Sequence, residues 1–232
     1  MNSASTLLLL LCLLTASAGP SLADKTVEDW NNLGVALFGQ GKYEDAIVAY
    51  QNATLLDPDN AMVLGNIGLT LASQGKYNES YSALNRTTIL NPKDALAWSN
   101  MGLVLDNLGR YDEALTAYSR SLEIAPGVAR TWNNQGLAYH HLEREEEALT
   151  AYEKATTLDP KYGAAWRNQG SALLNLGRYE EALSAYDKAI EINPDDSAAY
   201  VTKSDALDKL GRIEEAGVAK VKATEINQRY GI

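Results

Sequence analysis

Five of the six prolines in this 232-residue chain recur at a constant interval of 34 residues. They are Pro58, Pro92, Pro126, Pro160 and Pro194. A glycine recurs at the same interval from Gly34 to Gly170. A fixed period of this length is typical of proteins that stack copies of one small structural unit. The period therefore predicts a repeat array, and every local motif has to be interpreted within it.

Each period contains two helical patterns, which residues 95–128 illustrate. Trp98 and Gly102 lie four residues apart and share one face of a first helix. The pattern is interrupted around Gly109, and a second apolar helical pattern follows until Pro126 ends the unit. One helix hairpin cannot bury both of its faces, so neighbouring hairpins are expected to stack.

The order of these residues resembles the tetratricopeptide repeat. Tryptophan is followed by glycine four residues later, by alanine twelve residues after that, then by an aromatic residue and by proline. The resemblance implies an all-α fold, an α-solenoid that winds as a right-handed superhelix of six antiparallel helix hairpins. The units are residues 27–60, 61–94, 95–128, 129–162, 163–196 and 197–230.

The hairpin turn carries a glycine in five units, and the exception is the fourth. Gly109 in the third unit and Gly177 in the fifth illustrate the rule, whereas the fourth unit has Glu143 there. A glutamate does not favour the left-handed backbone of such turns. We therefore expect the helix to continue through this turn.

The two ends of the array carry capping signals. Thr26 and Asp29 fit a capping box at the start of the first helix. In the last unit, Lys203, Ser204 and Lys220 replace an apolar residue, the glycine and the aromatic residue. These changes predict a degenerate capping unit with a polar outer face, which a terminal repeat needs.

The first 23 residues contain no charged side chain and include the apolar run Leu7–Leu14. Small residues follow up to Ala18 and Ala23. This pattern predicts that residues 1–23 form a secretory signal peptide, cleaved after Ala18 or Ala23. The protein is then expected to be exported, as an extracellular, periplasmic or cell-envelope protein. The remaining chain lacks cysteine, so its fold depends on burial without disulfides.

Asparagine recurs two residues before the glycine of each of the first five units. The series is Asn32, Asn66, Asn100, Asn134 and Asn168. Helical spacing places these residues off the buried stripe, on a face that would line the concave groove of such an array. An asparagine amide offers donors and an acceptor that match a peptide bond. The resemblance implies that the series can hold a peptide, but hydrogen bonding between repeats is an equally open interpretation.

Other residues on this face indicate the character of a partner. The apolar ones are Val35, Phe38, Met62, Leu69, Leu96, Leu103, Leu137 and Leu174. Apolar residues are unusual on a solvated face and indicate a partner surface. Arg130 and Arg167 come from neighbouring units and are candidates to bind a carboxylate.

Other classes of function lack support in the sequence. A formal net charge of −10 argues against nucleic-acid or anionic-membrane partners. His140 and His141 are adjacent, and side chains about 100° apart on a helix do not chelate one metal well. The recurring glycines belong to the repeat and form no phosphate-binding loop. We therefore predict no enzymatic activity, no metal and no cofactor.

The leading prediction is an interaction module that binds an extended peptide or a helix in its concave groove. The alternative is a cell-envelope assembly scaffold that binds through its convex face or its ends, with the asparagine series serving the fold. Asn52, Asn78 and Asn85 stand in glycosylation sequons. Three sequons do not indicate glycosylation, because this composition produces about two by chance.

Overall fold

The computed structural model describes residues 25–231, so the predicted signal peptide lies outside the described residues. The described chain forms twelve α-helices and no strand. Their bounds are α1 (Val27–Gly39), α2 (Tyr43–Leu56), α3 (Ala61–Ser73), α4 (Tyr77–Leu90), α5 (Ala95–Asn107), α6 (Tyr111–Ile124), α7 (Ala129–His141), α8 (Glu145–Leu158), α9 (Gly163–Asn175), α10 (Tyr179–Ile192), α11 (Ser197–Lys209) and α12 (Ile213–Tyr230). Consecutive helices pair as antiparallel hairpins, which confirms the predicted all-α repeat fold.

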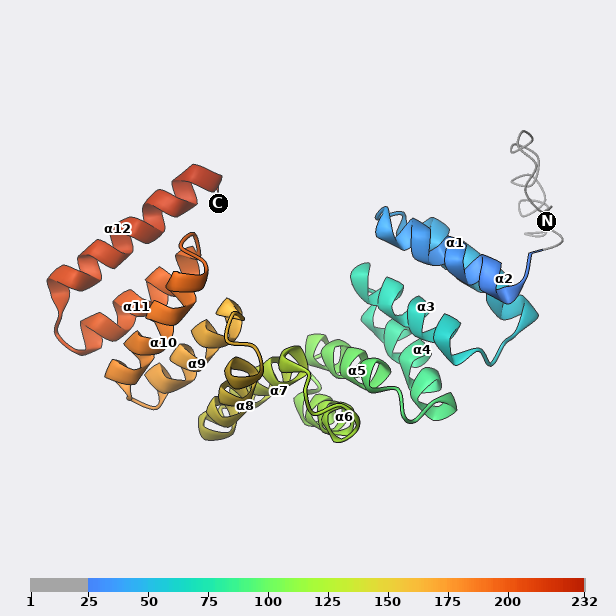
Figure 1. Cartoon of the computed structure of the whole chain (residues 1–232), viewed down its shortest axis with the longest axis horizontal. Coiled ribbons are helices and arrows are strands. Elements are labelled where there is room, and N and C mark those ends of the chain that lie inside the picture. The colour runs from blue at the N-terminus through green and yellow to red at the C-terminus, as the bar shows by residue number, and fades with distance from the viewer. Residues whose placement is uncertain (1–24, 232) are drawn as a thin grey trace. The chain divides into compact units, whose positions relative to one another are not determined.

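The helices divide into two compact units. The first contains α1 and α2 and ends at Pro58, and the second contains α3 to α12 and begins at Asp59. Within the second unit, each first helix packs against its own second helix, and α5, α7, α9 and α11 also pack against the second helix of the preceding hairpin (Figure 1). Neighbouring first helices also contact one another, whereas neighbouring second helices among α4 to α12 do not. The first helices therefore lie on the concave side of this unit.

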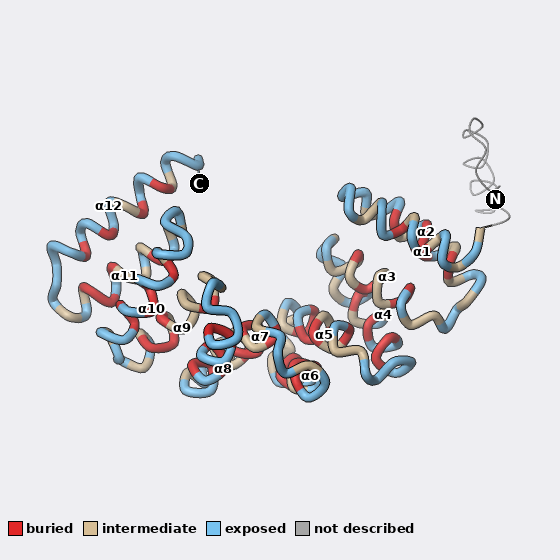
Figure 2. The backbone as a smooth tube through the Cα atoms, in the orientation of Figure 1, coloured by how far each residue is buried: buried red, intermediate tan, exposed pale blue. Residues whose placement is uncertain are grey.

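In four hairpins of the described chain, a glycine of the first helix lies directly against a tyrosine ring of the second helix. A Cβ atom added to Gly102 would lie 2.6 Å from the ring of Tyr118, and one added to Gly170 would lie 2.5 Å from the ring of Tyr186. Both tyrosines are fully buried. Buried segments accordingly follow the facing sides of the helices (Figure 2). The recurring glycine is thus required because the second helix lays an aromatic ring on the backbone of the first.

The N-termini of several first helices carry side-chain caps. The Thr26 hydroxyl accepts a hydrogen bond from the Asp29 amide at 3.2 Å, and the Asp29 carboxylate accepts one from the Thr26 amide at 2.9 Å. This confirms the predicted capping box, and these hydrogen bonds lower the pKa of Asp29. Asn60, Asp94 and Asp196 cap α3, α5 and α11 in a similar way.

The last hairpin differs from the others in length and surface. Helix α12 has 18 residues, whereas α10 has 14. Its added turn brings Arg229 and Tyr230 against Asp195, at 3.1 and 2.8 Å. Val218 and Val221 are nevertheless 71% and 59% exposed, so the outer surface is less polar than the sequence predicted.

The turn of the fourth unit corrects another prediction. Helix α7 ends at His141 and α8 begins at Glu145, so the helix does not continue. Glu143 has a φ of 58°, close to the 72° of Gly109 in the preceding unit. The hairpin requires this turn because the Tyr152 ring must lie on Gly136 of α7. Tertiary packing therefore holds a glutamate in a left-handed conformation that L-residues disfavour.

We expect Glu143→Gly to raise the free energy of unfolding by about 1 kcal/mol, because glycine adopts this conformation without steric cost. Urea denaturation followed by circular dichroism measures the change. The matched control is Gly109→Glu, which should lower stability by a similar amount. Equal stability of Glu143→Gly and the wild-type protein would contradict a strained turn.

Candidate peptide-binding groove

Residues spaced four and three apart share one face of each first helix. On α3 and α5 this face presents, in order, Met62, Asn66 and Leu69, and Leu96, Asn100 and Leu103. Each asparagine thus stands between two apolar side chains. Since first helices lie on the concave side of the α3–α12 unit, these two triplets face its groove.

A hollow of about 200 Å³ lies between α3 and α5, on the groove side. Its lining includes Met62, Asn66, Leu69, Leu96 and Asn100. Three apolar side chains on this face are strongly exposed: Met62 at 64%, Leu96 at 57% and Leu103 at 42%. The structure therefore brings together Asn66, Asn100 and Leu69 of the predicted site, in an apolar setting.

Asn100 is the asparagine best placed to meet a ligand. It is partly exposed, and its side chain makes no hydrogen bond within residues 25–231. An amide in such a setting keeps both its donors and its acceptor for an incoming group.

Helix α7 continues the same surface with Arg130, Asn134 and Leu137. Asn134 and Leu137 are partly exposed, and Arg130 is exposed and forms no ion pair within the described chain. Burial raises the pKa of Tyr162, and the charge of Arg130 opposes that shift, so the guanidinium lies near the start of α9. Arg130 therefore presents an unpaired positive charge beside the apolar part of the groove.

Asn168 on α9 is engaged within the fold. Its amide donates a hydrogen bond at 2.9 Å to the side-chain oxygen of Asn133 on α7. Asn133 is only 3% exposed, so it does not lie open on the groove face. Asn168 therefore links two neighbouring repeats, which fits the interpretation that the asparagines bond between repeats.

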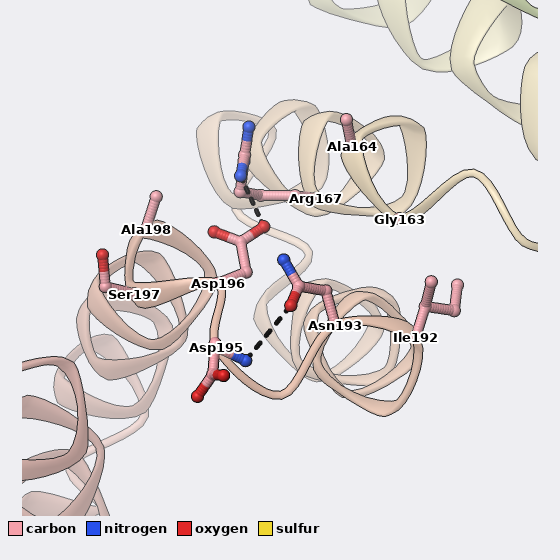
Figure 3. Close-up of a pocket in the computed structure, with 9 residues that line it drawn as sticks. All are labelled: Gly163, Ala164, Arg167, Ile192, Asn193, Asp195, Asp196, Ser197 and Ala198. Carbon is pink, nitrogen blue, oxygen red and sulfur yellow. Dashed lines mark hydrogen bonds and ion pairs between the residues drawn. The ribbon is translucent and has the colours of Figure 1, made fainter. Parts of the chain in front are cut away.

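Arg167 is also engaged. It forms an ion pair with Asp196, the residue that caps α11. Figure 3 shows the two side chains pointing toward each other at the edge of a cavity of about 440 Å³ between α9, α10 and α11. Its lining also includes Asn193 and Asp195, whose backbone amide donates to the Asn193 side chain at 3.2 Å. Arg167 thus already holds a carboxylate of its own chain and is not an open partner to Arg130.

In three units the position just before the asparagine links neighbouring repeats, which the repeat pattern did not predict. Ser99, Asn133 and Arg167 occupy this position, and each bonds to the next first helix or to its cap. The Ser99 hydroxyl lies 3.1 Å from that of Thr131, Asn133 accepts from Asn168, and Arg167 pairs with Asp196. The sequence shows these three polar residues at one repeat position, but their bonds depend on which residue lies opposite in the next repeat.

Three predicted groove residues belong to the first compact unit. Asn32, Val35 and Phe38 lie on α1; the first two are exposed there and Phe38 is partly exposed. At the far end of α7 and α9, Glu145 accepts hydrogen bonds from His140 at 2.9 Å and from Asn175 at 2.7 Å. The His141 ring stacks on that of Tyr111, with centroids 4.8 Å apart, so the two histidines have different partners.

Models of the tetratricopeptide repeat match residues 27–60, 93–161, 134–197 and 167–230. The chain belongs to the tetratricopeptide repeat family, a class of protein-interaction modules. No curated protein sequence matches the chain. No described helix has the length and apolar character needed to cross a bilayer.

Solved structures of similar fold include MamA, residues 41 to the end, from Desulfovibrio magneticus RS-1. It is 23% identical over 73% of this chain and 96% of its own, with a TM-score of 0.68. PilF of Pseudomonas aeruginosa is 17% identical over 88% of this chain and 92% of its own, with a TM-score of 0.76. YrrB, described as a TPR protein with an unusual peptide-binding site, is 24% identical over 74% of this chain and 88% of its own, with a TM-score of 0.64. These likenesses show the fold.

We expect Asn168→Ala to lower the free energy of unfolding by about 1–2 kcal/mol, because it removes the hydrogen bond to the buried Asn133 side chain. Asn100→Ala should lower it by no more than about 0.5 kcal/mol, since Asn100 has no such bond and alanine is the better helix former. Urea denaturation of both variants tests the difference. Equal losses would show that the asparagines serve the fold alike.

Asp106 on α5 is a partly buried carboxylate. Its Oδ1 atom is buried and makes no hydrogen bond within the described chain. Burial raises the pKa of Asp106, while the charge of His141 opposes the shift. The folded state therefore binds this proton more tightly than the unfolded state, and the carboxylate reduces stability as pH rises through its pKa.

We expect Asp106→Asn to stabilise the protein at neutral pH, and the gain to shrink as pH falls toward the ordinary aspartate pKa of 3.8. Thermal unfolding of the variant and the wild-type protein, from neutral pH down to this pKa, measures the gain in stability. A gain independent of pH would contradict burial of the charge as the cause.

Proposed function

We propose that the groove formed by α3, α5 and α7 binds an extended peptide that lies across these first helices. The observation that carries the proposal is the unbonded amide of Asn100 between the exposed side chains of Leu96 and Leu103. The amide would bond the peptide backbone, and the leucines would cover apolar side chains of the ligand. Burying one such side chain contributes about 1.5–3 kcal/mol, so two or three suffice for measurable binding.

The contacts on α9 limit the length of the bound segment. Because Asn168 and Arg167 bond within the fold, the open asparagine amide lies on α5 and the open cation on α7. First helices packed about 8–10 Å apart give three helices a span of about 20 Å. An extended peptide covers that distance with about six residues.

The charges on the groove indicate the chemistry of the peptide. Arg130 is unpaired, whereas the charge of Arg167 is balanced by Asp196. A peptide with large apolar residues over α3 and α5, followed by an acidic residue or a terminal carboxylate at α7, would complement this surface. Under the predicted export of the chain, this partner would be met outside the cytoplasm.

Selection from a library of random linear peptides tests the proposal. Selected sequences should be enriched in large apolar residues with an acidic residue at one end. Asn100→Ala and Leu103→Ser should each weaken binding of a selected peptide about tenfold or more, and Arg130→Ala should do so for peptides that carry the acid. Fluorescence polarisation measures the affinities.

The matched control is Asn85→Ala, which removes an exposed asparagine from α4 outside the groove. It should leave the affinity unchanged. If Asn85→Ala weakens binding as much as Asn100→Ala, or if neither groove variant has an effect, the ligand lies elsewhere. The scaffold interpretation, with binding through the convex face or the ends, would then be favoured.

A further inference from the structure

Helix α12 lacks the residue with which other second helices contact the next hairpin. At that position α6, α8 and α10 carry Leu115, Leu149 and Leu183, which are 8%, 6% and 7% exposed. Helix α12 carries Gly217 instead, and a Cβ atom there would meet nothing within 4 Å. A glycine inside a helix destabilises it, and no contact within the described chain requires this one.

On α12, exposed apolar residues lie on the face next to Gly217. Val218 and Val221 are 71% and 59% exposed. At these two positions α4, α6, α8 and α10 carry polar residues: Ser82 and Asn85, Thr116 and Ser119, Thr150 and Glu153, and Ser184 and Asp187. A hollow of about 340 Å³, whose lining includes Tyr200, Leu207 and Val218, lies beside this surface. Helix α12 thus presents an apolar surface at positions where α4, α6, α8 and α10 are polar.

We infer that α12 is the contact surface of a symmetric dimer, in which it packs antiparallel against α12 of a second copy. The face is self-complementary about a two-fold axis level with Val218. Val218 then meets its counterpart, and Val221 of each copy lies beside Gly217 of the other, where the missing side chain leaves room.

The charges on α12 fit the same arrangement. Glu214 and Lys222 lie four residues before and after Val218, so an antiparallel pair brings Lys222 of each copy level with Glu214 of the other. Glu214 forms no ion pair within residues 25–231, and Lys222 has a long contact of 3.4 Å to Glu225. Glu214 is therefore open to a partner, and Lys222 would exchange its long contact with Glu225 for the pair across the dimer. This complementarity argues for a second copy of the chain as the occupant.

Sedimentation velocity of the purified protein over a range of concentrations tests the dimer. A contact formed by one helix from each copy is small, so we expect a reversible dimer that dissociates on dilution. Val218→Asp should weaken dimerisation about tenfold or more, because it places two carboxylates at the two-fold axis. The matched control is Val48→Asp: Val48 lies at the same repeat position on α2, is 57% exposed and should leave the dimer intact. Circular dichroism verifies that both variants remain helical.

A charge exchange tests the antiparallel register. Lys222→Glu should weaken the dimer, and adding Glu214→Lys should restore it, since the reversed pairs again attract. A wild-type protein that stays monomeric at the highest soluble concentration would overturn the inference. A dimer that resists Val218→Asp, is lost with Val48→Asp or is not restored by the exchange would overturn it too. Asn100→Ala should leave dimerisation unchanged, so this result is independent of the proposed peptide groove.

Discussion

The contact between a tyrosine ring and a glycine backbone, repeated within the hairpins, determines much of the remaining structure. Tyr118 lies on Gly102 so closely that no side chain fits at the glycine position. This contact sets the rotation of the first helix about its own axis. The residues near the glycine are thereby divided between a face turned toward the second helices and a face left for the groove. Asn100, two residues before the glycine, lies on the groove side for this reason.

The groove has an open part and a part closed by contacts within the fold. On α3 and α5, exposed apolar side chains surround Asn100, which keeps its hydrogen-bonding capacity. On α9, Asn168 bonds to Asn133 and Arg167 pairs with Asp196. Residues at one repeat position therefore have different roles, because their neighbours in the next repeat differ. A buried polar group needs a partner, and the repeat provides one where a polar residue lies opposite.

The predicted repeat pattern accounts for nearly all helix boundaries, since glycine, proline and the apolar spacing act locally. It does not account for the turn at Glu143, where the local preference for a continued helix loses to packing across the hairpin. It also does not account for the surface of α12. Lysines in the last unit predicted a polar outer face, but Val218 and Val221 are exposed at positions where α10 carries the polar residues Ser184 and Asp187.

The sequence by itself determined the class of fold, the number of hairpins and the side of each first helix that carries the asparagines. These features follow from a period of 34 residues and from helical spacing, both of which can be counted along the chain. Only the tertiary structure decided which candidate residues remain open to a ligand. Asn133, Asn168 and Arg167 are engaged because side chains about one repeat away come within hydrogen-bonding distance. That distance depends on how neighbouring helices cross, and it cannot be derived from the spacing of residues along one helix.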